Sequence, residues 1–147
     1  MNDFPSIDHL TDWPDVEDLM CTYLERFGRT VTETDLSDDG RRELETFLGG
    51  GGVLIEINRA GGGAPDGLKD IAPIVVKVTT ARRSRSWRVM NNQIRKAVKV
   101  AENGVAVDGV LLDSMSETGD LSLVPGLDPD DRSVEMLFLV TCRRPRF

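Results

Sequence analysis

The chain has 147 residues, of which 39% are apolar, 29% are charged and only 5% are aromatic. This length fits one ordinary domain with a single core built mainly from aliphatic side chains. No stretch approaches the roughly 18–20 apolar residues that span a bilayer, and the acidic N-terminus does not resemble a secretory signal. These features exclude a membrane protein and predict a soluble body that acts where it is made.

The net charge of −7 is unevenly distributed along the chain. Residues 1–48 contain 13 acidic and 4 basic residues, residues 49–103 contain 4 and 10, and residues 104–147 contain 8 and 4. Such blocks favour contacts between opposite faces of neighbouring copies, or they neutralise one another within one fold. Simple nucleic-acid binding is disfavoured, because the acidic domain as a whole repels phosphate.

The first expected element is a helix from Asp15 to Phe27. Pro14 is expected at its first position and Gly28 at a left-handed cap after its end. Residues 1–11 lack order signals and are expected to form a flexible segment. Six apolar side chains recur at helical spacing along the helix and form one stripe: Val16, Leu19, Met20, Tyr23, Leu24 and Phe27.

The following segment, residues 30–52, gives weaker signals. Residues 30–34 (TVTET) are rich in β-branched side chains and predict a short strand. Ser37 and Gly40 indicate a turn, and residues 41–48 fit one or two helical turns. The glycines at 49–52 carry no side chains that could order the chain.

Residues 53–59 and 71–80 predict two strands that form a long hairpin around a Gly/Pro-rich loop. Pro73 is expected at an edge position, where a missing backbone donor is tolerated. Residues 84–103 then predict a second helix, with Ser84 or Ser86 as N-cap and Asn103–Gly104 at its end. Its apolar face is expected to contain Trp87, Met90, Ile94, Ala97, Val98 and Ala101.

Strands are also expected at residues 110–115 and 134–143, with a possible short one at 121–124 and an acidic turn at 128–132. Residues 134–143 carry apolar side chains on both faces, which indicates a central strand or a face covered by a neighbouring subunit. We therefore predict one α+β domain over residues 1–147, with a mainly antiparallel sheet and two principal helices packed on one face.

No catalytic, metal-binding or cofactor-binding constellation is expected. Neither glycine tract opens a helix after a strand, as a phosphate-binding loop requires. His9 is the only histidine, which excludes a zinc site with several imidazoles from one chain. Cys21 and Cys142 are expected to be two buried thiols, with a disulfide or a metal pair as the alternative.

The most informative feature is a basic cluster at the start of the second helix, where the helix dipole disfavours cations. A compensating partner is therefore expected: the acidic first helix of the same chain, a neighbouring subunit, or DNA phosphates. The candidate acidic partner face is Asp15, Glu17 and Asp18. The cluster consists of Arg82, Arg83, Arg85 and Arg88.

The ordered set of elements over about residues 12–144 resembles a known family. The set begins with WPDVEDL at residues 13–19, followed by the strand 53–59 with Gly61–Gly62 just after it. It continues with the strand 74–78, the helix around 94–98, and a closing strand 135–144 with Thr141 and a basic end. This order is similar to that of the tail terminator proteins of siphophages that infect actinobacteria. The glycine tract at 49–52 and the acidic stretch before it depart from the family pattern.

The resemblance implies an α+β subunit, without catalytic residues or cofactor, that forms a hexameric ring on the head-proximal end of the tail tube. The implied partners are other copies of the chain, the tail tube protein and head–tail connector proteins, with possible non-specific contact to genomic DNA in the lumen. The implied location is the virion tail, and the host cytoplasm during assembly. Alternatives are another head–tail connector or adaptor subunit, or a small host enzyme or binding module.

Overall fold

Six strands form one mixed sheet, in the order β1–β2–β3–β6–β5–β4, in this computed structural model, which describes residues 3–118 and 132–144. The strands are β1 (Arg29–Val31), β2 (Leu54–Arg59), β3 (Lys69–Thr79), β4 (Val105–Val107), β5 (Val110–Glu117) and β6 (Ser133–Arg143). The helices are α1 (Val16–Leu24), continued by a 3₁₀ turn at Glu25–Phe27, α2 (Asp38–Gly49), α3 (Arg83–Val89) and α4 (Arg95–Val100). A π-helical segment, Met90–Ile94, joins α3 to α4 into one long helix.

The predicted α+β class is confirmed, and the sheet is antiparallel except at one edge. There β1 pairs in parallel with β2, from Arg29 opposite Leu54 to Val31 opposite Glu56. The connection between these two strands contains α2, a third helix in addition to the two that were predicted. Parallel pairing requires such a crossover, because a tight turn can join only antiparallel strands.

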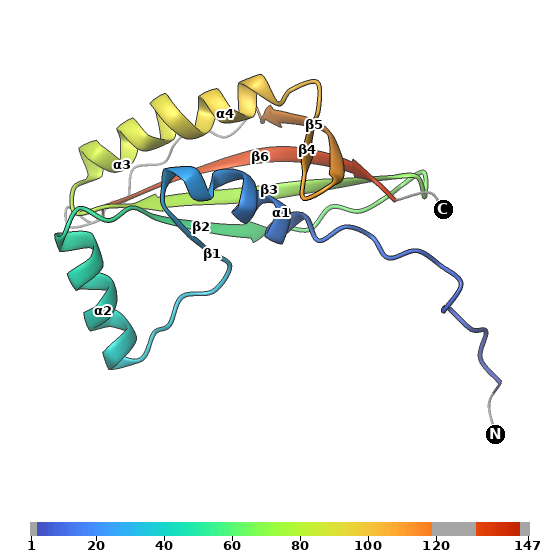
Figure 1. Cartoon of the computed structure of the whole chain (residues 1–147), viewed down its shortest axis with the longest axis horizontal. Coiled ribbons are helices and arrows are strands. Elements are labelled where there is room, and N and C mark those ends of the chain that lie inside the picture. The colour runs from blue at the N-terminus through green and yellow to red at the C-terminus, as the bar shows by residue number, and fades with distance from the viewer. Residues whose placement is uncertain (1–2, 119–131, 145–147) are drawn as a thin grey trace.

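The core lies on one face of the sheet, between the central strands and the helices α1, α3 and α4 (Figure 1). In the pairing of β3 with β6, Ile74 lies opposite Phe138 and Val76 opposite Met136, and all four side chains are buried. The position of β6 between β3 and β5 confirms the central strand predicted for residues 134–143. On the other face of these strands, Leu137 is only partly buried.

Helix α1 is confirmed, from its cap at Asp15 to the 3₁₀ turn that ends at Phe27, but the roles expected for Pro14 and Gly28 are wrong. Asp15, not Pro14, starts the helix: its carboxylate accepts a hydrogen bond from the backbone N–H of Asp18. Gly28 has an extended backbone, with φ 168°, rather than a left-handed one. Glycine is needed there for space, since a Cβ atom would lie 2.7 Å from the carbonyl oxygen of Val53.

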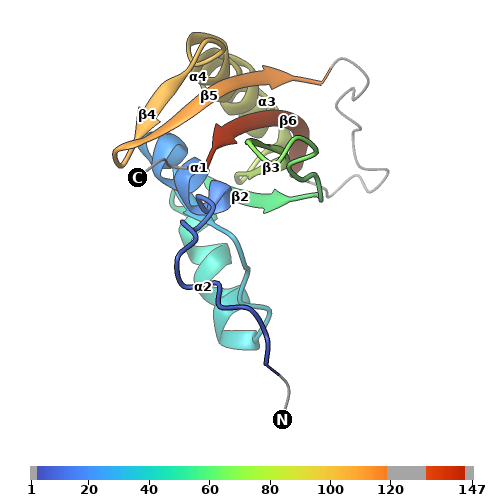
Figure 2. The same ribbon diagram turned by 90° about the vertical axis from the view of Figure 1, so that its right-hand side faces the viewer.

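Helix α2 is longer than the one or two turns expected, and Ser37 caps it instead of forming a separate turn with Gly40. The Ser37 hydroxyl accepts a hydrogen bond from the N–H of Gly40. Leu48 is its one buried residue, and the helix projects away from the sheet (Figure 2). The glycines after it form an ordered turn in which the N–H of Gly52 bonds to the carbonyl of Phe47.

Pro73 lies in β3, which is a central strand, so the expected edge position is wrong. Its carbonyl accepts a hydrogen bond from the N–H of Ala60, beyond the last β2–β3 pair, Arg59 with Ile74. The N and O atoms of one strand residue point to the same side. The nitrogen of Pro73, which has no hydrogen to donate, therefore points toward the chain beyond the end of β2. No β2–β3 ladder hydrogen bond is lost there.

The second helix begins at Arg83, and neither predicted serine caps it. Ser86 lies inside α3 and is fully buried, whereas Trp87, expected in the core, is 41% exposed. The other five apolar residues expected on its face are buried. The stripe thus passes through Ser86 and Met90, which places Trp87 at its outer margin.

The sequence analysis predicts β5 but not β4, which is the first strand of the β4–β5 hairpin. Asp108 and Gly109 join the two strands with φ angles of 48° and 76°, values of a type I′ turn. The Asp–Gly pair between VAV and VLL is a strong sequence signal for such a hairpin. The possible strand at 121–124 lies outside the described residues, as does most of the expected turn at 128–132.

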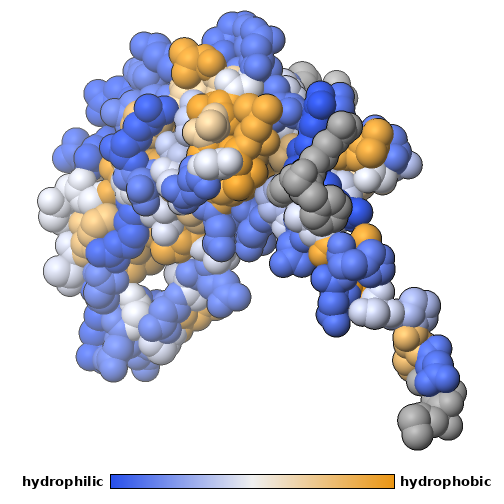
Figure 3. Space-filling model, turned by 45° about the vertical axis from the view of Figure 1, so that its right-hand side comes forward, coloured by the Kyte–Doolittle hydropathy of each residue, from blue (hydrophilic) through white to orange (hydrophobic). Residues whose placement is uncertain are grey.

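Residues 3–14 contain no helix or strand, and the segment leads away from the sheet (Figure 1). In the space-filling view it forms a narrow arm that leaves the body of the molecule (Figure 3). Phe4, Ile7 and Leu10 are exposed along this segment. Flexibility of residues 1–11 stays a prediction.

Candidate functional site

The basic cluster, Arg82, Arg83, Arg85 and Arg88, lies on the first turns of α3. Three of the arginines are exposed and Arg85 is half-buried. None of them forms an ion pair within residues 3–118 and 132–144. The exposed ring of Trp87 shares this surface, and arginine next to tryptophan is a combination enriched at protein interfaces.

A buried hydroxyl network holds the start of α3 against the sheet. The Ser86 hydroxyl donates to the carbonyl of Arg132 and accepts from the N–H of Thr80, at 2.6 and 3.0 Å. The Thr80 hydroxyl in turn donates to the carbonyl of Arg82, at 2.7 Å. These contacts fix the backbone of the basic cluster, so its arginines are presented from a rigid base.

The expected pairing of the basic cluster with the acidic first helix does not occur within the described residues. Arg85 instead lies near Gly51, just after the C-terminal end of α2. Cations are favoured near the carbonyl groups at such an end. Helix α2 therefore offsets part of the unfavourable dipole at the start of α3, and three arginines still point to solvent.

Two of the three residues of the candidate acidic face, Asp15, Glu17 and Asp18, already form hydrogen bonds within the chain. Asp15 caps α1, and a carboxylate oxygen of Glu17 accepts a hydrogen bond from the backbone N–H of Arg59 at 3.1 Å. Asp18 is exposed and its carboxylate makes no hydrogen bond or ion pair with a described residue. Two of the three proposed contact residues thus have structural roles that sequence spacing did not indicate.

The two roles of Asp15 can be separated by substitution. Asp15→Ala is expected to lower the free energy of unfolding by about 1 kcal/mol, because the N–H of Asp18 loses its acceptor. Asp15→Asn keeps a capping oxygen and should cost only a few tenths of that. Urea denaturation measures both, and equal losses for the two variants would contradict the capping role.

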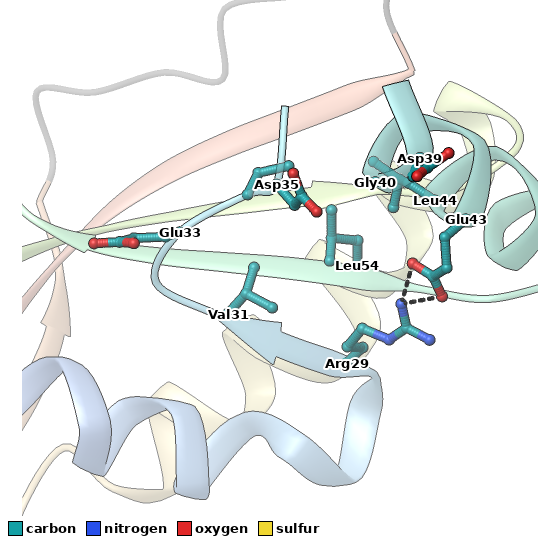
Figure 4. Close-up of a pocket in the computed structure, with 10 residues that line it drawn as sticks. Arg29, Val31, Glu33, Asp35, Asp39, Gly40, Glu43, Leu44 and Leu54 are labelled. Carbon is teal, nitrogen blue, oxygen red and sulfur yellow. Dashed lines mark hydrogen bonds and ion pairs between the residues drawn. The ribbon is translucent and has the colours of Figure 1, made fainter. Parts of the chain in front are cut away.

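A hollow of about 390 Å³ opens between β1, the start of β2 and α2 (Figure 4). We call it the acidic hollow. Val31, Leu44 and Leu54 contribute its apolar lining. Its polar lining consists of Arg29, Glu33, Thr34, Asp35, Asp39 and Glu43. Four carboxylates against one guanidinium give these residues a formal charge of −3.

Arg29 is fully engaged at one end of the acidic hollow. Its guanidinium donates to both carboxylate oxygens of Glu43, at 2.9 and 3.1 Å, and stacks on the Phe47 ring at 3.7 Å. Glu33 lies at the opposite end (Figure 4). Asp35 contacts Gly40 and accepts a hydrogen bond from the N–H of Ser37, and hydrogen bonding by Ser37 lowers the pKa of this carboxyl group.

A second hollow, between α4 and β5, has charges that are mostly paired. Arg95 donates to both carboxylate oxygens of Glu117, at 2.6 and 3.0 Å, and Lys99 lies 2.8 Å from Glu102. Lys96 also lines this second hollow and makes no ion pair with a described residue, which leaves a formal charge of +1 there. The acidic hollow, at −3, has the larger uncompensated charge of the two.

The cysteines are free thiols, so the alternative of a disulfide is excluded. Burial raises the pKa of Cys142 to about 11 and also raises that of Cys21, which is half-buried rather than buried. Both are thus protonated at neutral pH and poor nucleophiles. In the described parts of the chain, no three His, Cys, Asp or Glu side chains gather to hold a metal ion.

A family model described as phage tail termination protein matches residues 12–147. The chain belongs to this family. It is therefore a structural component of a phage tail, in agreement with the resemblance drawn from the order of its elements. A comparison with curated proteins found no match.

The match to the tail termination family includes the basic cluster and the acidic hollow, and leaves only residues 1–11 outside. No helix in the described ranges has the length and apolar character to cross a membrane. Sequence reasoning located the basic cluster but missed the acidic hollow. The signal in the sequence is the run of acidic residues at 33–45, part of the stretch that departs from the family pattern.

Proposed function

We propose that this tail terminator forms a homo-hexameric ring on the head-proximal end of the tail tube of a siphophage with an actinobacterial host. The ring ends tube growth and offers the surface to which head–tail connector proteins dock. The chain reaches this position from the host cytoplasm during assembly. Family membership supports the tail role, and no catalytic or cofactor role is part of the proposal.

The main support for a ring is the basic cluster, whose arginines form no ion pair with the described residues of their own chain. A closed ring needs heterologous contacts, in which one face of a copy meets a different face of the next. Exposed arginines around Trp87 on one face, and surplus acids elsewhere, supply such a pair of faces. Asp15, Glu17 and Asp18 remain candidates for the acidic side, although Asp18 is the one of the three whose carboxylate makes no hydrogen bond or ion pair with a described residue.

The decisive assay polymerises purified tail tube protein with and without this chain and measures tube lengths by electron microscopy. The expected result is short tubes of uniform length with a ring at one end. Tubes of the same length distribution in both samples would contradict the proposal. A ring at the correct end that leaves growth unaffected would instead favour the runner-up, another head–tail connector subunit.

Reversing two charges of the basic cluster tests the contact between copies. Arg83→Glu/Arg85→Glu is expected to weaken ring assembly by roughly tenfold for each ion pair lost, as followed by mass photometry. Lys69→Glu/Lys96→Glu is the matched control, because it makes the same change in net charge at exposed lysines without an ion pair in the described ranges. Equal assembly of both variants would refute the role of the cluster.

DNA is the other partner considered for these arginines. Non-specific binding to phosphates is strongly weakened by salt, since it releases counter-ions. If the cluster faced DNA in the lumen, the double variant would assemble normally and lose only affinity for duplex DNA.

A further inference from the structure

The acidic hollow has the lining of a receptor for a basic side chain. Val31, Leu44 and Leu54 can pack against the methylene stem of an arginine or lysine. Glu33 and Asp35 can accept hydrogen bonds from its charged end. Among the described residues, Arg29 is the one basic residue of the lining, and it is held by Glu43 and Phe47 and so does not fill this role.

The most suitable cation on the page is Arg83 of another copy. Arg83 and Trp87 stand four residues apart on α3, so they lie on the same side of the helix, and both are exposed. Arg85 is half-buried beside Gly51, which makes it less available. An arginine that enters the acidic hollow would bring Trp87 onto its rim, as a buried aromatic anchor requires.

We propose that the acidic hollow of one copy receives Arg83 of the next, with Trp87 packed at its rim. This contact rests on the proposed ring and specifies its acidic side, which then lies between β1 and α2 rather than on α1. The donor and receptor surfaces differ, so the contact is compatible with the heterologous interface that a ring requires. Helix α2 takes part through a surface that residues 3–118 and 132–144 leave uncovered.

Complementary charge reversals test this contact. The hollow variant is Glu33→Lys/Asp39→Lys, which spares the carboxylates with close intrachain hydrogen bonds; Asp39 lies 3.8 Å from Arg42. The donor variant is Arg83→Glu. Each alone is expected to self-associate at least tenfold more weakly than the wild type, whereas an equimolar mixture should associate again, because opposite charges then meet at both kinds of contact.

Sedimentation velocity at low salt, over a series of concentrations, gives the readout. Recovery in the mixture cannot come from misfolded variants, so it separates contact from stability. Asp8→Lys/Asp12→Lys is the matched control, since it makes the same charge change on exposed residues of the N-terminal segment. This control is expected to associate as the wild type does.

Three results would overturn the contact: wild-type chain that stays monomeric throughout, variants that associate like the wild type, or a mixture without recovery. The tube assay keeps this question apart from the proposed function. Wild-type chain that stops tube growth while the hollow variant stops it equally well would refute the contact and leave the proposed function standing. If the variants and their mixture associate as predicted but the wild-type chain has no effect on tube length, the contact stands and the proposed function is refuted.

Discussion

Replacing Arg59 with methionine is expected to lower the free energy of unfolding by about 3 kcal/mol, because it leaves a buried carboxylate without its counter-ion. The Arg59 guanidinium donates to both oxygens of Asp70, each at 2.6 Å, and only 9% of the Asp70 side chain is exposed. Arg59 also donates to the carbonyl of Gly61, so it ties the β2–β3 loop to the sheet.

The control for this prediction is Arg95→Met. Arg95 makes a similar two-pronged pair with Glu117, but more than a third of each side chain is exposed there. Exposed pairs contribute roughly 0–1 kcal/mol, so this variant should unfold at nearly the wild-type urea concentration. Equal losses for the two variants would show that burial of Asp70 does not set the cost.

The same pair predicts a pH dependence. Hydrogen bonding to Arg59 lowers the pKa of Asp70. A group with a lowered folded-state pKa contributes stability above its unfolded pKa, about 3.9, and that contribution is lost as the pH falls through the folded value. The stability difference between wild type and Arg59→Met should therefore be constant near neutral pH and narrow below about pH 4. A difference that widened in acid would contradict the assignment.

Gly62→Ala is expected to destabilise the protein by about 3 kcal/mol or more, through a strained backbone and a collision together. Gly62 has φ +81°, and a Cβ atom there would lie 2.1 Å from the carbonyl oxygen of Ile71. The close approach arises because Gly63 and Ile71 bridge the two ends of the loop with hydrogen bonds of 2.8 and 3.2 Å.

Gly61→Ala is the matched control for Gly62→Ala. Gly61 has nearly the same backbone angle, φ +87°, but its Cβ position is open. This variant should cost only the strain of a left-handed residue, about 1 kcal/mol. Thermal unfolding of the pair isolates the collision, and similar losses would mean that the loop moves to accommodate the methyl group.

Strong periodic patterns made much of the fold predictable. The apolar stripe of α1 and the alternation along β6 each reflect burial against the same core, so local pattern and tertiary packing agree. The central place of β6 followed from apolar residues on both of its faces. Helix ends were less certain, as Asp15 and Gly28 show, because capping and close packing depend on contacts that periodicity does not encode.

The missed features lack such a pattern or depend on distant contacts. Helix α2 was expected only as one or two turns at residues 41–48, because its apolar residues Leu44, Phe47 and Leu48 all lie in its C-terminal half and only Leu48 is buried. Strand β1 has only three residues, and so short a segment carries no sequence signal for parallel rather than antiparallel pairing. Trp87 was assigned to the core because its spacing from Met90 fits a helix, yet the stripe continues through Ser86, whose hydroxyl bonds to Arg132, far away in the sequence.

The two parts of the candidate site also differ in how far the sequence predicts them. The basic cluster is contiguous and was found directly. The acidic hollow joins residues of β1, the following loop, α2 and β2, and exists only after the parallel crossover has formed. For the candidate acidic face on α1, spacing could not reveal that Glu17 accepts a hydrogen bond from the backbone N–H of Arg59.

The pairing of β3 with β6 has a kinetic consequence. These two longest strands meet across an intervening chain, and even their nearest partners, Thr79 and Ser133, are 54 residues apart. Non-local pairing of this kind raises contact order and slows folding, because loop closure costs entropy before any contact compensates it. The basic cluster follows β3 directly and its backbone is anchored to Arg132 at the start of β6. A newly made chain is therefore expected to present this surface in its final form only after β3 and β6 have paired, so that copies associate as complete subunits.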